Sequence, residues 1–522
     1  MQQLAFAPDV LWVTNSPSIP LAMPAKKAHT VLGQEFQAIV FDAFSGFDVN
    51  AFAAISGTLR GGGVLVLLSP PLDEWADYPD PDYRRFLPYP YQPEQVEGRF
   101  LRRLVGMLDS VGSPPAPPQS LPRDGGQASV IAAILSATTP VVLTADRGRG
   151  KSAALGMAAS ALVEQGLRVL LTAPSRAAVT AVFKHAPLPP AFFAPDDLLQ
   201  TLPVGDVLLV DEAAAIPIPL LLKLLQHYPR CVFSTTLHGY EGSGRGFVLR
   251  FQKALEVLAP GWQALRLQQP MRWAADDPLE QAINRWLLLD VGDGVAPVVE
   301  GAQQYQQLDR DALLADEPLL RQVFGLLVTA HYQTRPSDLR QMLDAPDLSV
   351  HVLEQGGQVT AVALLSREGG LDATLTAAIH AGQRRPHGHP VPQTLTFHAK
   401  LAGAAELVCE RVMRIAVHPE LQGQGLGKQL LARLVQYATE RAADYIAVSY
   451  AMTPELLQFW GQAGFVLARV GQRRDAASGS CSVVQIRGLT AAGQALVGRC
   501  LSCQQAANAP NVPSSQPSRY KP

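Results

Sequence analysis

Hydrophobic runs of strand length alternate along this chain with segments of helical periodicity, and this pattern predicts a multidomain α/β protein. Near the N-terminus, apolar runs at residues 38–41 and 64–68 are separated by a helix-length segment and by glycines at residues 61–63. Such runs are typical of a small Rossmann-like α/β unit. We expect this unit to span residues 1–112, and we find no catalytic signature in it.

A strand, a glycine-containing loop and a helix follow one another at residues 141–163. The loop ends in Gly-Arg-Gly-Lys-Ser at residues 148–152, but Ala145 stands where the usual phosphate loop has its first glycine. In such a loop the backbone amides turn toward phosphate, Lys151 reaches the β and γ phosphates of a nucleotide, and Ser152 ligates Mg²⁺. The alternative is a structural glycine turn.

An acidic pair about 60 residues later favours the nucleotide interpretation. The apolar strand at residues 207–210 leads into Asp211 and Glu212. A nucleotide hydrolase uses such a pair, because one carboxylate holds Mg²⁺ through water and the other orients the attacking water. A helix-capping acid pair is the alternative. Polar segments at residues 172–175 and 234–236 also follow strands, as in RecA-like motors. We therefore predict a RecA-like P-loop ATPase domain, helicase-like, over residues 120–334.

Two further side chains are candidates for this nucleotide site. Gln127 lies about 24 residues before Lys151 and either reads the adenine edge or has a structural role near a helix start. Arg272 either reaches the γ phosphate as an arginine finger or is a surface arginine beside Trp273. Spacing alone does not separate these interpretations.

The last third of the chain predicts a different phosphate site. Apolar runs at residues 350–354 and 359–365 predict a hairpin, and residues 411–417 predict another strand. A Gln-x-x-Gly-x-Gly loop at residues 422–427 follows that strand and leads into a helical pattern. Its amides suit a pyrophosphate, but it lacks the Gly-Lys-Ser/Thr ending that serves a γ phosphate. We therefore expect a diphosphate with a long arm, such as coenzyme A. A glycine-rich helix start in an unrelated α/β domain is the alternative.

A strand at residues 445–448 and a helix at residues 454–461 complete a pattern that resembles the GNAT acetyltransferases. We expect this domain to span residues 335–490. A short tail without ordered structure is expected at residues 491–522. The tail contains the CxxC pair Cys500 and Cys503, which lacks the second ligand pair of a zinc site.

Composition changes this picture little. The chain has 522 residues, 48% hydrophobic, and a formal net charge of −2, so a nucleic acid would have to be held by local basic patches. The longest apolar stretches have strand length and the N-terminus lacks a secretory signal, so we expect a cytoplasmic protein with no membrane partner. One arginine cluster either grips an RNA backbone or forms a solvated helix face. Its members are Arg84, Arg85, Arg99, Arg102 and Arg103.

Seven segments together resemble the bacterial tRNA(Met) cytidine acetyltransferase family. They span roughly residues 36–488 and read ADRGRGKSA, VDEAAAIP, TTLHGYEGSGRGF, PMRWAADDPLE, DLRQMLDAP, RVMRIAVHPELQGQGLG and TPELLQFWGQAGFVLARVGQRRDAASG. The resemblance implies transfer of an acetyl group from acetyl-CoA to the N4 amine of the wobble cytidine of elongator tRNA(Met), coupled to ATP, with no DNA partner. It also implies a longer C-terminal RNA-contacting region than the residues after 490 provide.

The resemblance further implies two sets of cofactor contacts. Those to ATP are Gln127, Gly148, Arg149, Gly150, Lys151, Ser152 and Arg272. Those to acetyl-CoA are Ile415, Ala416, Val417, Gln422, Gly423, Gln424, Gly425, Leu426, Gly427, Lys428 and Glu455. Ser152 and Asp211 are the candidate Mg²⁺ ligands.

The chemistry of such a reaction can be reasoned independently. A thioester is already activated, so a motor module suggests mechanical work on the acceptor, as unstacking a base in a structured RNA requires. The N4 amine is a poor nucleophile, so catalysis should rely on positioning, on a backbone amide of residues 415–417 polarising the thioester, and on proton removal. His418 is the candidate base, or alternatively caps the turn before Pro419. Glu410 is a lesser candidate, and Tyr450 is a possible acid for the departing thiolate.

Two other classes of function remain open from the sequence. One is a protein or small-amine acetyltransferase with a regulatory ATPase, which ATP turnover independent of RNA would favour. The other is a non-catalytic RNA-binding factor, which a failure to bind acetyl-CoA would favour.

Overall fold

The structure is a computed structural model that describes most of the 522-residue chain. The described residues are 9–17, 19, 22–108, 126–236, 245–271, 273–274, 277–292, 301–330, 334–474 and 481–508. The chain forms two compact units. The first comprises Met1–Leu364, Arg414–Leu430 and Asp475–Gly479, and the second comprises Leu365–Met413, Leu431–Arg474 and Ser480–Pro522.

The N-terminal part of the first unit is a three-stranded parallel sheet in the order β1-β2-β3. Its elements are β1 (Val10–Val13), β2 (Phe36–Asp42), α1 (Val49–Ser56), β3 (Leu59–Leu68) and α2 (Arg99–Leu108). The side chains of Phe41, Phe47 and Phe52 are buried and lie with ring centroids 5.1 to 5.7 Å apart. This confirms the predicted small α/β unit.

The arginine cluster of this part has a role that neither sequence interpretation gave it. Arg99 donates to Asp311 at 2.7 Å, and Arg103 donates to Glu317 at 2.7 Å and to the carbonyl of Trp286 at 2.6 Å. Both arginines are less than 10% exposed. The expectation of an RNA grip or a solvated face is therefore wrong for these two residues. Their partners lie more than 180 residues away in sequence, where no local pattern connects them.

A six-stranded parallel sheet in the order β6-β5-β7-β8-β4-β9 forms the centre of the next part. Its strands are β4 (Val141–Ala145), β5 (Val169–Thr172), β6 (Ala191–Phe192), β7 (Val207–Val210), β8 (Cys231–Thr236) and β9 (Gln263–Leu267). Its helices are α3 (Gln127–Ser136), α4 (Lys151–Glu164), α5 (Thr180–Lys184), α6 (Pro195–Thr201), α7 (Ile218–His227) and α8 (Arg245–Leu258).

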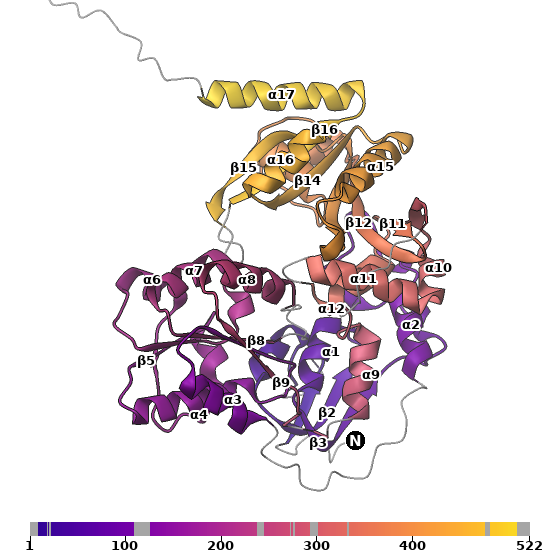
Figure 1. Ribbon diagram of the computed structural model, residues 1–522. Helices are drawn as coiled ribbons and strands as arrows, with labels where there is room; N and C mark the ends of the chain where they lie inside the picture. Colours follow the sequence, from indigo (N-terminus) through magenta and orange to yellow (C-terminus); the bar gives the residue numbers. More distant parts are fainter. Residues whose placement is uncertain are drawn as a thin grey trace, which may run out of the picture. The chain divides into compact units, whose positions relative to one another are not determined.

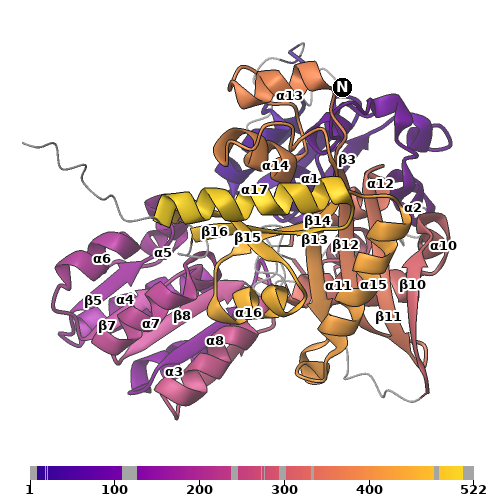
Figure 2. The same cartoon turned by 90° about the horizontal axis from the view of Figure 1, so that it is seen from above.

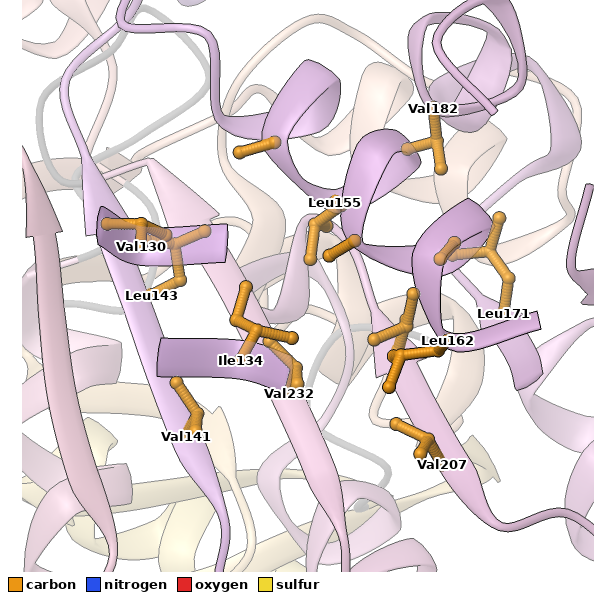
Figure 3. Packing of buried hydrophobic residues seen from close by; sticks show 14 of the residues in the cluster. Val130, Ile134, Val141, Leu143, Leu155, Leu162, Leu171, Val182, Val207 and Val232 are labelled. Carbon is orange, nitrogen blue, oxygen red and sulfur yellow. The ribbon is translucent and has the colours of Figure 1, made fainter. Parts of the chain in front are cut away.

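Both faces of this sheet are covered by helices, as Figure 1 shows. On one face, Val141 and Leu143 pack with Leu155 of α4 (Figure 3). On the other face, Val142 packs with Phe247 and other side chains of the cluster that includes α7. Burial on two faces explains why these strands read as continuous apolar runs, and each fully buried valine or leucine contributes about 1.5–3 kcal/mol.

The parallel register brings the candidate polar residues to one edge of this sheet. Ala145 of β4 is paired with Thr236 of β8, and Val210 of β7 is paired with Phe233 of β8. The loop after β4 and Asp211 after β7 therefore leave the sheet at its carboxyl edge, the edge at which open α/β sheets bind ligands.

Further helices and one strand lead from this sheet to the next. They are α9 (Pro278–Leu287), β10 (Gln303–Leu308), α10 (Arg310–Ala315), α11 (Glu317–Ala330) and α12 (Pro336–Asp344). Arg340 of α12 is fully buried, and its guanidinium donates to Asp80 at 2.8 Å and to the carbonyl of Phe47 at 2.6 Å. This buried ion pair ties α12 to the N-terminal part.

The acetyltransferase-like part is built on a seven-stranded sheet in the order β10-β11-β12-β13-β14-β16-β15. Its remaining strands are β11 (Leu348–Gln355), β12 (Gln358–Gly369), β13 (Val408–Val417), β14 (Tyr445–Ala451), β15 (Val466–Arg474) and β16 (Cys481–Gly488). Its remaining helices are α13 (Ala373–His380), α14 (Pro390–Gln393), a π-helix (Thr394–His398), α15 (Leu426–Glu440) and α16 (Pro454–Gln462). The boundary between the two units passes through β12, β13 and α15.

The strands predicted near residues 350, 360, 411 and 445 and the helix at 454 are present. The expected domain boundary at residue 335 is too late, because β10 already belongs to this sheet and pairs antiparallel with β11. Its sequence, QQYQQL, contains no apolar run and alternates in burial, so it was not recognised as a strand.

The tail is the other correction. Residues Ala491–Asn508 form helix α17, and Leu496 and Cys500 pack into the core with Tyr445 and Ile486. Figure 2 shows α17 beside β15 and β16. The expectation of disorder is therefore wrong for this helix, whose small residues gave a weak amphipathic signal. Among the helices that the structure describes, none combines the length and hydropathy needed to cross a membrane.

Candidate functional site

The loop between β4 and α4 has a backbone that only glycine adopts easily. Gly148 and Gly150 have φ values of 76° and 77°. A Cβ on Gly148 would lie 2.6 Å from the ring of Trp273, and a Cβ on Gly150 would lie 2.2 Å from Nε2 of Gln127. Both glycines are therefore required by conformation and by close approach, and they place the N-terminus of α4 at the carboxyl edge of the sheet.

Lys151 lies between two carboxylates that are distant in sequence. Its Nζ is 3.0 Å from Oδ1 of Asp211 and 2.8 Å from Oε1 of Glu212. The hydroxyl of Ser152 donates to Oδ2 of Asp211 at 2.9 Å. Burial disfavours the charge of Lys151, but the two carboxylates outweigh that effect and raise its pKa above the ordinary value. The four residues predicted to serve a magnesium nucleotide are thus brought together, with the lysine positively charged.

Gln127 and Arg149 also lie at the loop, with their side chains engaged within the protein. Nε2 of Gln127 donates to the carbonyl of Gly150 at 2.9 Å. The guanidinium of Arg149 pairs with Glu280 at 2.8 Å, and Glu280 also accepts from Nε1 of Trp273 at 2.8 Å. Both side chains are therefore held within the protein, and the contacts of Gln127 and Arg149 with ATP stay predictions.

The candidate arginine finger, Arg272, lies outside the described residues. Glu280 was missed by sequence reasoning, although it follows a helix-starting Asp-Pro pair. That pair could have marked Glu280 as a first-turn residue, but its contact with Arg149 arises only in three dimensions.

The glycine loop before α15 has free space around its glycines, unlike the loop between β4 and α4. Gly423 and Gly425 have φ values of 81° and 85°, and a Cβ on either would meet no atom within 4 Å. The carbonyl of Gly425 accepts from the amides of Lys428 and Gln429 at 3.0 Å, which starts the 15-residue helix. The first amides of a helix have no acceptor within it, so an anion can accept from them. These residues fit a pyrophosphate.

One hydrogen bond links this loop to β13. Nε2 of Gln422 donates to the carbonyl of Val417 at 3.3 Å. Ala416 is buried, while Ile415 and Val417 are half-buried. The parallel pairing of β13 with β14 covers Cys409–Val412 and Tyr445–Val448. Within the described register it does not extend to Met413 and Ser449, so the two strands stop sharing hydrogen bonds there.

His418 caps the short 3-10 helix Pro419–Leu421, as one of its two sequence interpretations proposed. Its Nδ1 accepts from the amide of Glu420 at 3.4 Å, and its own amide donates to the carbonyl of Thr360 at 2.9 Å. Burial lowers the pKa of His418, so the imidazole is neutral near pH 7. While Nδ1 accepts a hydrogen bond, the proton of the neutral ring lies on Nε2. The lone pair on Nδ1 of His418 can either accept from the amide of Glu420 or take a proton as a general base, but it cannot do both at once.

The remaining candidates all lie in the second unit. Glu410 is 2% exposed and pairs with Arg367 at 2.9 Å and with Arg441 at 3.6 Å. The hydroxyl of Tyr450 donates to Oε1 of Gln485, and burial raises the pKa of Tyr450 to about 12. Glu455 lies exposed in the first turn of α16. A doubly paired carboxylate is a poor proton acceptor, whereas a protonated tyrosine can donate.

Of the CxxC pair, the structure describes only the side chain of Cys500. Cys500 of α17 is buried in the core, and the side chain of Cys503 lies outside the described residues. In the part of the chain that the structure describes, no group of three or more His, Cys, Asp or Glu could hold a metal ion.

Comparison with known proteins connects these sites. Three family models match: the N-terminal model of tRNA(Met) cytidine acetyltransferase TmcA at residues 2–112, the helicase domain of RNA cytidine acetyltransferase NAT10/TcmA at residues 142–188 and 190–290, and GNAT acetyltransferase 2 at residues 322–444. The tRNA(Met) cytidine acetyltransferase TmcA of Nitrosococcus halophilus is 45% identical over 94% of this chain and 73% of its own length. The chain belongs to the tRNA(Met) cytidine acetyltransferase family.

Other members of the tRNA(Met) cytidine acetyltransferase family are similar over comparable lengths. The protein of Salmonella typhimurium is 39% identical, with 94% of this chain and 74% of that protein covered. The protein of Vibrio cholerae is also 39% identical, with 88% and 66% covered. Roughly a quarter to a third of each relative has no counterpart in this chain. Among solved structures, the ribosomal-protein-S18-alanine N-acetyltransferase of Escherichia coli is 13% identical with a TM-score of 0.25, covering 36% of this chain and 95% of that one.

The predicted family and fold class are thereby confirmed for this tRNA(Met) cytidine acetyltransferase relative. Along the chain, an N-terminal α/β unit is followed by a helicase-like ATPase fold and then by a GNAT acetyltransferase fold. The roles of individual site residues stay predictions.

Proposed function

We infer that this chain is an acyltransferase that moves the acetyl group of acetyl-CoA to the N4 amine of a cytidine in tRNA, the wobble cytidine of elongator tRNA(Met), in an ATP-dependent reaction. The observation that carries this inference is the presence of two chemically different phosphate cradles in a chain of this family. One cradle has a charged lysine between two carboxylates. The other is an open pair of glycines at a helix start, without any such lysine.

At the first cradle, the residues fit ATP with Mg²⁺. Mg²⁺ held near Ser152 and Asp211 would neutralise charge on the β and γ phosphates. Lys151 is poised to exchange its two carboxylate partners for phosphate oxygens, because its side chain is only 8% exposed and remains charged. Asp211, which is fully buried, would then hold Mg²⁺, and Glu212 would orient a water molecule.

At the second cradle, the residues fit the pyrophosphate of acetyl-CoA. A Cβ on Gly423 or Gly425 would meet no atom within 4 Å, and Lys428 is exposed in the first turn of α15. In the described register β13 stops pairing with β14 after Val412, and a backbone amide on that side of the strand would polarise the thioester carbonyl. Ile415, Ala416 and Val417 follow on that strand.

Proton transfer is assigned to two side chains. Tyr450 keeps its proton at neutral pH and is the acid for the departing thiolate. His418 is neutral and serves as the base once its Nδ1 releases the amide of Glu420, a release made easy by the long 3.4 Å hydrogen bond. Glu410, held by two arginines, has a supporting role instead.

ATP hydrolysis would serve to move the target cytosine of the tRNA into the acetyltransferase site. The thioester supplies the free energy of acylation, whereas extraction of a stacked cytosine requires a few kcal/mol of mechanical work. A substrate tRNA places the protein in the cytoplasm, and no DNA or membrane partner is needed.

The test is an acetylation assay in which the modified nucleoside is identified chemically. The protein is incubated with labelled acetyl-CoA, ATP, Mg²⁺ and a transcript of elongator tRNA(Met), and nucleosides are resolved by mass spectrometry. N4-acetylcytidine that depends on ATP is the expected product. A transcript whose wobble cytidine is replaced by uridine is the matched control. Acetylation of a protein or polyamine instead, with tRNA untouched, overturns the proposal.

A further inference from the structure

The segment between β12 and β13 concentrates positive charge in a chain that is slightly acidic overall. From Ala373 to Ala405 it has no Asp or Glu, but it has Arg384, Arg385 and Lys400 and four of the chain's 11 histidines. The whole chain has a formal net charge of −2, so this segment differs in sign from its surroundings. A local basic surface of this kind is how a neutral protein holds a polyanion.

The basic side chains gather around the π-helix Thr394–His398. Burial lowers the pKa of His398, and the positive charges of Arg469, Arg385 and Lys400 lower it further. Arg385, His398 and Lys400 are exposed, and Arg469 of β15 is half-buried. The β12–β13 segment and β15 therefore place positive charges close enough to act on His398 of the second unit. We name Arg385, Phe397, His398, Lys400 and Arg469 the basic patch.

Among the residues that the structure describes, the cations of the basic patch form no ion pair with an acid. In the described part of the second unit, the ion pairs join Arg367 and Arg441 to Glu410 and Arg411 to Glu368. None of these pairs uses a cation of the basic patch. By contrast, the guanidinium groups of Arg99 and Arg103 in the N-terminal part form ion pairs with carboxylates of the protein. A cation held near other cations without an acid gains most from an anionic ligand.

An aromatic ring lies within the basic patch. Phe397 is 36% exposed, and its ring centroid is 4.6 Å from Nζ of Lys400 and 4.8 Å from the ring of His398. A Cβ on Gly382 would lie 2.8 Å from this ring, so one edge of Phe397 rests against the backbone of the preceding loop. Aromatic rings flanked by cations are the means by which proteins stack an unpaired base while holding its phosphates.

Hydrogen bonds to neighbouring residues hold the loop that carries Arg385. The amide of Gly369 donates to Nδ1 of the buried His389 at 2.9 Å, and the amide of Val391 donates to Glu368 at 3.1 Å. Nε2 of Gln393 donates to the carbonyl of Pro386 at 3.0 Å. These bonds hold the segment in one conformation, so binding there would require little ordering.

We propose that the basic patch binds the substrate RNA, with Arg385, Lys400 and Arg469 on phosphates and Phe397 stacked on an unpaired base. The proposal rests on the proposed function for the identity of the RNA. It assigns an RNA contact to the acetyltransferase part itself, in a chain that spans 66% to 75% of the length of several relatives.

Binding is tested directly, so that the result does not depend on catalysis. Fluorescence anisotropy of a labelled anticodon stem-loop is measured with the full chain across a series of salt concentrations. The double variant Arg385→Ala/Lys400→Ala should weaken binding about 10- to 40-fold near 0.1 M salt and reduce the salt slope by about 1.5, as loss of two phosphate contacts requires. The control Lys26→Ala/Lys27→Ala removes the same charge from exposed residues of the N-terminal part.

A second variant separates stacking from charge. Phe397→Leu should weaken binding about 5-fold or more while leaving the salt slope unchanged, because stacking releases no counterions. The proposal is overturned if the double variant behaves like the lysine control, or if both variants bind an acidic peptide or anionic vesicles less well and RNA equally well. Absence of N4-acetylcytidine with wild-type protein would refute the proposed function alone, since the binding curves stand independently.

Discussion

The buried charge cluster at Lys151 allows function and stability to be separated by substitution. Lys151→Met keeps a long side chain but removes the charge that lies 3.0 Å from Asp211 and 2.8 Å from Glu212. Loss of one partner from a buried ion pair costs about 3–5 kcal/mol, out of a total stability of about 5–15 kcal/mol. Ser152 and the amide of Glu212 still donate to Asp211, so we expect the lower end, about 3 kcal/mol.

The double variant Lys151→Met/Asp211→Asn should recover much of that loss. The amide oxygen that replaces the carboxylate still accepts from Ser152, while the uncompensated charge is removed, so we expect a coupling of about 2–3 kcal/mol. ATP hydrolysis should fall at least about 100-fold in both variants, because a preorganised charge on the phosphates is gone in both. Acetyl-CoA affinity, measured by titration calorimetry, should stay unchanged.

The assays are scanning calorimetry, ATP turnover and N4-acetylcytidine formation on the same preparations. Lys184→Met, on the exposed side of α5, is the matched control for a lysine-to-methionine change in the same part. Modification of tRNA at the wild-type rate by Lys151→Met would refute the coupling of ATP to acetylation. An unaltered melting transition would refute the ion-pair argument, whatever happened to activity.

Three further predictions concern other sites. Gly425→Glu should abolish acetyl-CoA binding by filling the open cradle with a negative side chain, whereas Gly357→Glu, at a similar positive φ in the β11–β12 turn, should bind normally. His418→Asn keeps a side-chain acceptor for the amide of Glu420 but not a base, so acetylation should fall about 100-fold without loss of stability. Burial raises the pKa of Asp344 from 3.8 to about 6 despite Arg340, so this carboxyl stabilises the fold below pH 4 and loses that contribution as the pH rises through 6. Asp344→Asn, whose oxygen still accepts from Phe100, should remove this dependence and raise the unfolding free energy at pH 7.5.

Each of these has a result that would contradict it. Equal calorimetric affinity of the two glycine variants would remove the loop at residues 423–427 from the coenzyme site. Full activity of His418→Asn would leave the histidine only its capping role. Urea titrations at pH 5.0 and 7.5 that show the same pH dependence for Asp344→Asn and wild type would mean that this carboxyl titrates as it does in water.

The elements that the sequence predicted best are those whose signal is local. The run Val141 to Leu143 reads as a strand because both of its faces are buried, and the two glycine loops read as phosphate cradles because left-handed backbone favours glycine. Strand β10 was missed because its polar residues carry no hydrophobic pattern, and α17 because its small residues form only a faint stripe.

Contacts between distant segments were beyond the reach of the sequence. Nothing near Arg103 indicated Glu317, and nothing near Arg149 indicated Glu280. The interpretation of Arg99 and Arg103 was therefore wrong, and no local pattern indicated the basic patch, because its cations come from the β12–β13 segment and from β15.

The sequence by itself determined the family, the order of the folds and the two loops that suit phosphate, because backbone conformation and strand burial leave their mark within a few residues. Only the tertiary structure decided which charges are used internally and which remain available. That distinction depends on whether a carboxylate lies within about 4 Å of a cation, and such a distance is set by the packing of helices and strands far apart in the chain.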